Sequence, residues 1–488
     1  MRKTIKILGS GFSSLAAACY LAQQGNDVTI YEKNDTIGGR ARQFKKDGFT
    51  FDMGPSWYWM PDVFERFFQD FNKKPSDYYE LVKLNPAYRV YFGINDFISI
   101  YDNLEDIKST FEEIEKGSAQ KLQNFINQAK SNYDIAIKDL VYRPGVSPLE
   151  LITKKTALKL NQFFSNVSAD IRKKFKNERL IQILEFPVLF LGAKPTKTPS
   201  FYNFMNYADF GLGTWHPKTG MFDVIRGIEK LALELGVSIK TNAPIEKIVV
   251  ENSTATAIVI NGEVIKADII LSGADYQHTE TLLDKEHRAY SEKYWETRIF
   301  APSSLLFFIG FNKKIENISH HALFFDTDFD QHAVDIYDNP KWPESPLFYA
   351  NFPSKTDLTA APNGMETGFF LIPLAPGIED NEKLREEYFE KIITRFEQVT
   401  QQEIRNNIIF KKSFCKNDFV TDYNAYKGNA YGMANTLLQT AFLRPKLKSK
   451  KVRNLYFTGQ LTVPGPGVPP ALISGKLAAE LIQKSLRS

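Results

Sequence analysis

The chain has 488 residues, enough for two or more domains and a large core, and its 61 basic and 57 acidic side chains leave a net charge of +4. This near balance gives no indication of a nucleic-acid partner, and two cysteines, Cys19 and Cys415, exclude a cysteine zinc cluster and are typical of a reducing compartment. The six histidines show no metal-ligand spacing, and no apolar run reaches the roughly 18 residues of a membrane span. The cysteine count and the histidine spacing predict a protein without a metal. Because the first apolar segment is too short for a signal peptide, we expect the protein in the cytoplasm or on a membrane surface.

The first forty residues carry the pattern around which the chain is organised. They predict, in order, a short strand, a glycine turn, a helix of small and apolar residues and a second strand: Thr4–Leu8, Gly9–Ser14, Leu15–Ala22 and Asp27–Tyr31. The second strand ends at Glu32, 23 residues after Gly9, where a carboxylate can accept hydrogen bonds from a ribose hydroxyl. This order and spacing are typical of a dinucleotide-binding unit.

The glycines of this turn have steric roles. Gly9 permits the tight turn, and Gly11 lets the backbone approach a pyrophosphate held at the helix N-terminus. The third glycine of the fingerprint is replaced by Ser14, a small residue that still allows close packing of strand and helix. The alternative is a plain glycine turn. The candidate binding residues of this unit are Gly9, Gly11, Phe12, Ser13, Ser14, Glu32 and Lys33.

A second glycine motif follows the acid. The segment Gly38–Ala41 reads Gly-Gly-Arg-Ala, and an aromatic stretch after it closes on Phe51–Trp57. Here the sequence resembles the two-dinucleotide-binding flavoproteins, in which an acid, a short gap and a Gly-Gly-Arg motif close around the adenosine and diphosphate of FAD. The alternative is a glycine-rich surface loop with an incidental arginine. The candidate residues added here are Gly38, Gly39, Arg40, Gly54, Pro55 and Ser56.

Helical patterns fill much of the region from residue 61 to about residue 179. Residues 61–79 have an aromatic face, which favours core over the wall of a ligand site. Residues 104–179 mix basic and bulky apolar side chains, a pattern that fits equally a helix in a membrane interface and a solvated helix face. An apolar turn, Phe186–Gly192, is expected to end the helical region.

Beyond Phe210 the pattern changes to strands. A helix over Phe222–Leu235 is followed by predicted strands at residues 236–242, 244–250, 255–260, 263–267 and 268–275. In a discontinuous nucleotide domain this block returns beside the first unit, and the backbone near Ile245 can contact adenine. Predicted strands between Ser303 and Leu374, followed by a helix over Lys383–Val399, suit the walls of a substrate cavity.

The end of the chain returns to the cofactor. A buried strand is predicted over Asn454–Gln460, and a rigid turn, Pro464–Pro470, opens a helix over Ala471–Lys484. The N-terminus of that helix can point its amides at the flavin N1/O2 edge and stabilise the charge of reduced flavin. The alternative is a proline-rich linker before a terminal helix. The candidate contacts here are Gly459, Gln460, Gly467 and Val468.

Taken together, these motifs resemble the bacterial phytoene-desaturase type of carotenoid desaturase across essentially the whole chain. Besides the two glycine motifs, the strongest matches are Asp52–Trp57, Trp215–Met221, Asn424–Tyr431 and Leu455–Lys476. Two departures stand out. Ser13–Ser14 replaces a pair of small glycine positions and can adjust diphosphate packing, and Pro469–Pro470 stands where the family commonly has Pro-Gly and can reshape the substrate mouth.

The resemblance implies an α/β fold with a discontinuous, Rossmann-like FAD-binding domain of residues 1–80, 211–290 and 446–488, as in amine oxidases and GDP-dissociation inhibitors. It also implies a mixed sheet-and-helix substrate domain of residues 81–210 and 291–445, whose helical part, 104–192, faces a membrane. The expected protein is cytoplasmic, peripheral on the inner face of the cell membrane, and takes a carotenoid from that membrane.

The activity that the resemblance implies is FAD-dependent desaturation of a carotenoid, with hydride transfer from the polyene to flavin N5 and proton loss from the adjacent carbon. Because a delocalised allylic cation makes that proton acidic, no catalytic acid or base is assigned. Phytoene and later carotenoids, including the substrate of a 3,4-desaturase, fit these residues equally. The alternatives are a carotenoid isomerase or ketolase, an amine oxidase, and a non-enzymatic prenyl-lipid-binding protein of the GDP-dissociation-inhibitor type.

Overall fold

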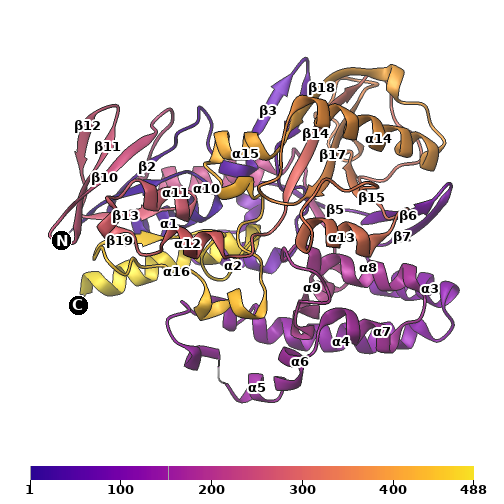
Figure 1. Cartoon of the computed structure of the whole chain (residues 1–488), viewed down its shortest axis with the longest axis horizontal. Helices are drawn as coiled ribbons and strands as arrows, with labels where there is room; N and C mark the ends of the chain where they lie inside the picture. Colours follow the sequence, from indigo (N-terminus) through magenta and orange to yellow (C-terminus); the bar gives the residue numbers. More distant parts are fainter. Residues whose placement is uncertain (1, 152, 488) are drawn as a thin grey trace.

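A five-stranded parallel sheet gathers strands from three distant stretches of the chain. The computed structural model describes residues 2–151 and 153–487 and orders these strands β19–β13–β1–β2–β9 (Figure 1). The bounds are β1 Thr4–Leu8, β2 Asp27–Tyr31, β9 Ser238–Lys240, β13 Ile269–Ser272 and β19 Leu455–Phe457. The predicted strands of this sheet are confirmed, and the two later stretches lie beside the first unit. The predicted division into an FAD domain and a substrate domain stays a prediction.

Helix α1 (Phe12–Gln23) packs on this sheet and on two further helices, α10 (Phe222–Glu234) and α16 (Val468–Arg487). The packing of α16 on α1 is very close, because a Cβ atom at Gly475 would stand 2.4 Å from the carbonyl oxygen of Ser13. Only a residue without a side chain allows the two helix backbones to approach in this way.

The last helix begins earlier than the sequence suggests. It starts at Val468, so Pro469 and Pro470 lie in its first turn and not in a preceding rigid turn, which corrects the predicted start at Ala471. Proline is tolerated there because the first N–H groups of a helix have no partner within the helix and its fixed φ already suits it.

A second, seven-stranded sheet forms the other half of the molecule (Figure 1). Its strand order is β18–β14–β17–β16–β15–β6–β7, and each neighbouring pair is antiparallel except β15 with β6. One face packs on α14 (Glu382–Thr400), and the other contributes to the largest core cluster. In order, the strands are β18 Ile408–Phe414, β14 Ser303–Phe311, β17 Glu366–Leu374, β16 Phe348–Asn351, β15 His321–Phe324, β6 Tyr88–Gly93 and β7 Asp96–Ile100.

Smaller sheets and short helices complete the framework. The sheets are β10–β11–β12 (Ile245–Glu251, Thr254–Ile260, Glu263–Lys266), β3–β4 (Gln43–Lys46, Phe49–Asp52) and β5–β8 (Leu81–Lys83, Trp215–Pro217). Besides α1, α10, α14 and α16, the α-helices outside the helical region are α2 Pro61–Gln69, α11 Tyr276–Thr281, α12 Glu292–Glu296, α13 Phe329–Tyr337 and α15 Lys416–Tyr423. Helix α2 is shorter than predicted, and its aromatic face is core: Val63, Phe64, Phe67 and Phe68 are buried.

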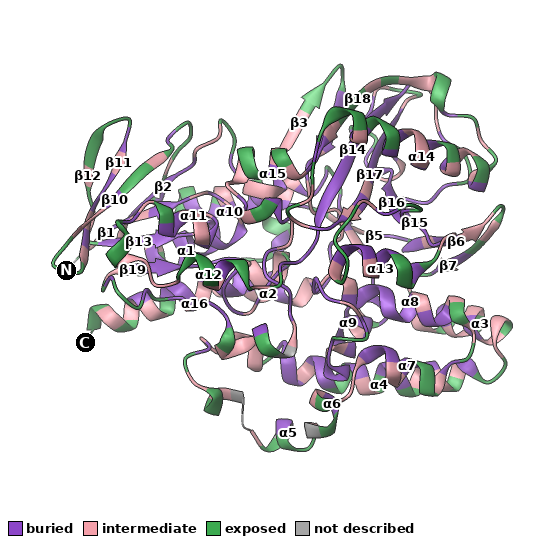
Figure 2. Ribbon diagram, viewed as in Figure 1, coloured by how far each residue is buried: buried purple, intermediate pink, exposed green. Residues whose placement is uncertain are grey.

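The predicted helical region is confirmed, with one correction at its end. Its helices are α3 Leu104–Ile114, α4 Ser118–Ala136, α5 Lys154–Ala157, α6 Leu160–Phe164, α7 Val167–Lys174, α8 Glu178–Leu189 and α9 Phe204–Asn206. Helix α8 continues through Pro187 to Leu189, where an apolar turn was expected, because its residues Leu184, Phe186 and Val188 are anchored in the core (Figure 2). Across the described ranges, every helix is too short or too polar to cross a membrane.

We expect Gly475→Val to lower the free energy of unfolding by about 1–3 kcal/mol, because the added side chain must push α16 away from α1. Thermal unfolding measures this. Glu480→Ala, an exposed change on the same helix, should stay within about 0.5 kcal/mol of the parent. Equal melting temperatures for Gly475→Val and the parent would show that this contact does not position α16.

Candidate functional site

One large cavity joins the two halves of the molecule. It has a volume of about 790 Å³ and runs from the glycine turn after β1, past Trp57, to the segments around Leu140 and Phe442. Its first part is lined by the sequence motifs and its second part by apolar side chains from α2, α8 and the seven-stranded sheet.

The residues predicted from the sequence to contact the cofactor line this cavity, with one exception. Ser14 is fully buried away from it, against Gly273, where it fills the place of the third glycine. The structure thus supports a packing role for Ser14 and not a direct contact. The lining residues are Gly9, Gly11, Phe12, Ser13, Glu32, Lys33, Gly38, Gly39, Arg40, Gly54, Pro55, Ser56, Ile245, Gly459, Gln460, Gly467 and Val468.

The glycine turn leaves room for a phosphate group. Gly9 has a φ of +81°, in the left-handed region, and Gly11 stands immediately before the first turn of α1. A Cβ atom at Gly11 would meet no atom of the described residues within 4 Å, so the backbone borders open space at the N-terminus of α1. Gly39 closes the other side, since its Cβ would stand 3.4 Å from the Gly11 Cα. The turn is a cradle in which backbone amides and the helix dipole favour an anion.

Glu32 is held in place by polar neighbours that the sequence did not single out. It is 4% exposed, and its Oε2 accepts hydrogen bonds from the Ser10 amide at 2.9 Å and the Ser10 hydroxyl at 2.7 Å. Its Oε1 accepts from the amide of Asn34 at 2.9 Å. Oε1 also accepts from the Asn34 side-chain amide at 3.0 Å, so four hydrogen bonds fill the about four acceptor positions of the carboxylate, and a ligand hydroxyl binds Glu32 only by replacing one of these donors. The only indication of this role in the sequence is that Ser10 is a polar residue between Gly9 and Gly11.

Arg40 brings a partly buried positive charge to the same part of the cavity. Its Nη2 donates to the carbonyl oxygen of Asn429 at 3.2 Å, and its Nε has no hydrogen-bond partner among the described residues. Burial lowers the pKa of Arg40, while the nearby carboxylate of Asp275 acts in the opposite direction, and a guanidinium stays protonated. An unpaired buried donor beside the glycine cradle fits the diphosphate of a dinucleotide.

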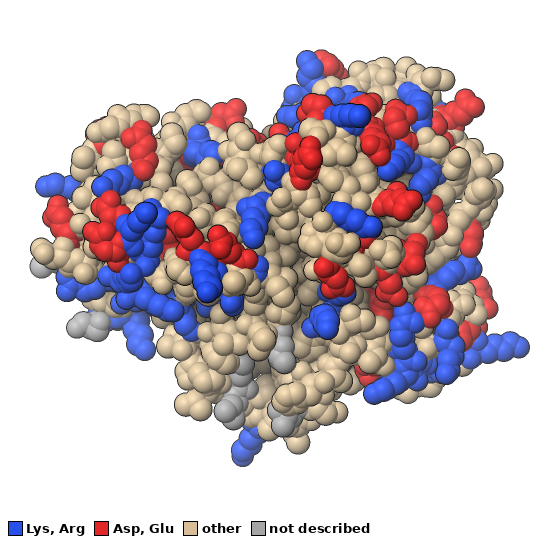
Figure 3. Space-filling view, viewed as in Figure 1, with Lys and Arg blue, Asp and Glu red and all other residues tan. Residues whose placement is uncertain are grey.

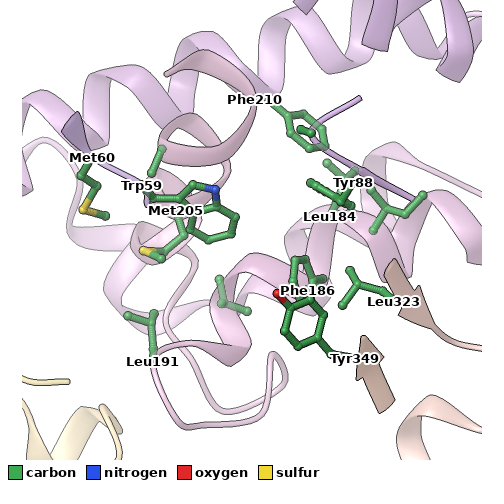
Figure 4. Close-up of a cluster of buried hydrophobic side chains, with 14 of the residues drawn as sticks. Trp59, Met60, Tyr88, Leu184, Phe186, Leu191, Met205, Phe210, Leu323 and Tyr349 are labelled. Carbon is green, nitrogen blue, oxygen red and sulfur yellow. The ribbon is translucent and has the colours of Figure 1, made fainter. Parts of the chain in front are cut away.

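The second part of the cavity is apolar and aromatic. Trp57 and Phe186 have ring centroids 5.6 Å apart, and Trp59 packs on Phe190 at 5.0 Å. Figure 4 shows Met60, Trp59 and Met205 close together on one side of this cluster, with the ring of Tyr349 beside Phe186 on another. A wall of this kind suits a long apolar ligand, and its members come from the segment before α2, from α8 and α9 and from β16, far apart in the sequence.

Metal chemistry has no visible ligand set in the described residues. No group of three or more His, Cys, Asp or Glu side chains there is arranged to hold a metal ion. Cys19 and Cys415 are both buried, and burial raises the pKa of each thiol, which makes them inert packing residues.

Comparison with known proteins agrees with this geometry. The family model for flavin-containing amine oxidoreductase matches residues 12–483. A carotenoid 3,4-desaturase of Haloarcula japonica is 40% identical over 98% of this chain and 97% of its own. A 4,4'-diapophytoene desaturase of Staphylococcus haemolyticus is 32% identical over 99% of both chains, and a zeta-carotene-forming phytoene desaturase of Myxococcus xanthus is 29% identical over 98% and 93%.

Solved structures with little sequence similarity share the fold. A redesigned putrescine oxidase has a TM-score of 0.63 at 12% identity and covers 99% of both chains. A Rab GDI of Plasmodium falciparum has a TM-score of 0.56 at 10% identity and covers 99% of this chain and 98% of its own.

The fold and the cradle define an α/β flavoprotein oxidoreductase. The chain belongs to the flavin-containing amine oxidoreductase family, and its cofactor is FAD, as expected from the motifs. The resemblance to carotenoid desaturases drawn from the sequence is confirmed by these relatives.

We expect Gly11→Val to fold normally and to lose FAD. The φ of Gly11 is −71°, which any residue adopts, and the new side chain would enter open space, so the cost falls on the cofactor alone. Flavin absorbance after purification, with the melting temperature as a check of folding, measures the loss. Lys313→Ala, a surface change at a residue that does not line the cavity, should keep full flavin. A Gly11→Val protein with full flavin would refute the phosphate cradle.

Proposed function

We propose that the protein desaturates a carotenoid with FAD as the oxidant. When bound, FAD supplies a two-electron acceptor that takes a hydride from a C–H bond. The observation that carries the proposal is the continuity of the cavity, in which the phosphate cradle at Gly11 and Arg40 opens directly into the apolar part lined by Trp57 and Phe186. The residues of the cradle hold the dinucleotide, and the aromatic walls exclude water and align a polyene along the cavity.

Among carotenoids, we propose a substrate whose C3–C4 bond is saturated. The relative at 40% identity is a carotenoid 3,4-desaturase, whereas the phytoene and diapophytoene desaturases are 29–32% identical. Lycopene is a suitable probe, because it is acyclic and has a single bond at this position. Phytoene serves as the competing substrate in the same assay.

We expect lycopene in liposomes to bleach the flavin of the anaerobic FAD-loaded protein and to yield a product with a red-shifted polyene spectrum. Each new double bond extends the conjugation, so the two signals should appear together in equal amounts. Stopped-flow absorbance follows both. A rearranged product without flavin bleaching would support an isomerase, and bound FAD with no reaction of lycopene or phytoene would contradict desaturation of either.

We further propose that the apolar end of the cavity opens onto a membrane surface. Exposed apolar side chains flank the segments that line this end, and they include Leu149 at 71%, Leu158 at 84%, Phe164 at 79% and Leu438 at 76% exposed. In Figure 3 the surface where Figure 1 places α5 and α6 carries few charges. Insoluble polyenes stay in the bilayer, so an apolar rim that enters the interface gives them a dry route to the cavity.

We expect the double variant Leu158→Asp, Phe164→Asp to weaken sedimentation with liposomes by at least about tenfold, because two apolar side chains no longer enter the bilayer. Flavin content and melting temperature should be unchanged. The matched control is Leu233→Asp, Val264→Asp, a pair of exposed apolar residues on α10 and β12, two elements that contribute no residue to the cavity lining. Equal sedimentation of both double variants and the parent would contradict this docking surface.

A further inference from the structure

A buried polar cluster lies behind one wall of the apolar cavity. The hydroxyl of Tyr349, a lining residue of β16, donates to the hydroxyl of Ser56 at 2.9 Å and is also 2.7 Å from Nδ1 of His321, so its hydrogen can rotate between the two acceptors. The imidazole of His321 is fully buried and stacks on Trp57, with ring centroids 4.0 Å apart and planes at 10°. Tyr349 therefore connects the cavity to a histidine that does not itself face it.

The Tyr349 hydroxyl contacts a short segment that also packs on the cofactor motif. Ser56 follows Gly54, whose Cα packs so closely on Arg40 that a Cβ there would stand 2.1 Å from the Arg40 carbonyl oxygen. The same short segment thus touches the cofactor motif at one end and Tyr349 at the other. The Tyr349 hydroxyl accordingly lies where the cradle passes into the apolar part of the cavity, which is where a reacting bond must come.

The hydrogen-bond pattern makes His321 a proton acceptor. The amide nitrogen of Asn351 lies 3.1 Å from Nδ1, and an amide NH2 only donates, so Nδ1 carries the lone pair and Nε2 the hydrogen. His332, which lines the cavity directly, has no such capacity. Its Nδ1 accepts from the Leu347 amide, and its Nε2 is 2.9 Å from the Pro373 carbonyl oxygen, so both nitrogens are held by the backbone.

We propose that Tyr349 accepts the proton that the carotenoid loses, with His321 as the positioning residue that takes the tyrosine's own proton. This inference rests on the proposed desaturation. One carbon of the substrate first loses a hydride to the oxidised cofactor. The C–H bond of the neighbouring carbon then breaks. Its electron pair becomes the new C=C bond, its proton moves to the Tyr349 oxygen, and the phenolic proton moves to Nδ1 of His321, which becomes imidazolium.

Such a weak base is sufficient for this reaction. Burial lowers the pKa of His321 well below its usual value and raises the pKa of Tyr349 well above its own, so both groups are neutral at ordinary pH and ready to act. The carbon acid in question is a polyene cation, which is far more acidic than an imidazolium ion. The low basicity therefore does not prevent transfer, and it keeps the acceptor free of protons from solvent.

Two more histidines lie beside His321 and can take up the positive charge that the proton transfer creates. The ring of His320 lies 4.5 Å from that of His321 and 4.4 Å from that of His216, measured between centroids. Both nitrogens of His216 and Nε2 of His320 and His321 are buried without hydrogen-bond partners among the described residues. Buried unpaired nitrogens are costly, and a cluster of them calls for a functional explanation. Nδ1 of His320 is 2.8 Å from the hydroxyl of the partly exposed Thr356, which brings the cluster towards solvent.

The test compares Tyr349→Phe and His321→Phe with Tyr388→Phe in the FAD-loaded protein, using lycopene deuterated at C3 or at C4. Tyr388 is a matched control, because it is buried, donates one hydrogen bond to the Pro343 carbonyl and does not line the cavity. Phenylalanine at position 321 keeps a ring against Trp57. Flavin content, melting temperature and lycopene binding, followed by tryptophan fluorescence, are measured in parallel.

We expect Tyr349→Phe to slow turnover by about 10²-fold and His321→Phe by a smaller factor, with flavin content and lycopene affinity preserved. The isotope effect at the carbon that loses the proton should rise in both variants and stay small in the parent and in Tyr388→Phe. Unchanged turnover, or slower turnover with an unchanged isotope pattern, would overturn the proposal. A parent that turns over neither lycopene nor phytoene would overturn the proposed function and this inference with it.

Discussion

The close approach of backbones around the start of α1 is the constraint on which the rest of the structure depends. Gly475 lets α16 rest on the backbone of α1, and Gly54 lets its segment lie against the carbonyl of Arg40. Gly273 has the same role on the sheet side, where a Cβ would stand 2.0 Å from the hydroxyl of Ser14. These contacts bring stretches separated by hundreds of residues to one helix N-terminus, which becomes the wall of the cofactor site.

The cavity that begins at this helix N-terminus has a polar part and an apolar part. The polar part offers amides, Glu32 and the unpaired Nε of Arg40 to a charged dinucleotide, and the apolar part offers aromatic rings to a polyene. The segment from Gly54 to Trp57 joins the two, because it packs on Arg40 at one end and on His321 at the other. A change in this segment therefore affects cofactor and substrate together, and a substitution within the apolar wall affects substrate alone.

The local motifs could be predicted from the sequence because their physics is local. A strand, a glycine turn and a helix need only neighbouring residues, and the acid at Glu32 follows at a fixed spacing. The predicted start of α16 at Ala471 is wrong, because proline disrupts the interior of a helix but is tolerated in its first turn. The link of Ser56 to Tyr349 and of Tyr349 to His321 could not be predicted, since it requires the seven-stranded sheet to be assembled first. For the same reason, the sequence indicates of the adjacent His320 and His321 only that they lack metal-ligand spacing.

The measurement that tests the account most directly is a crystal structure of the protein with FAD and lycopene bound. We expect the diphosphate to lie against Gly11, Gly39 and Arg40, and the polyene to pass Trp57 with its reacting bond near the Tyr349 hydroxyl. A diphosphate held elsewhere, or a polyene bound outside this cavity, would contradict the central claim that one continuous cavity serves cofactor and substrate.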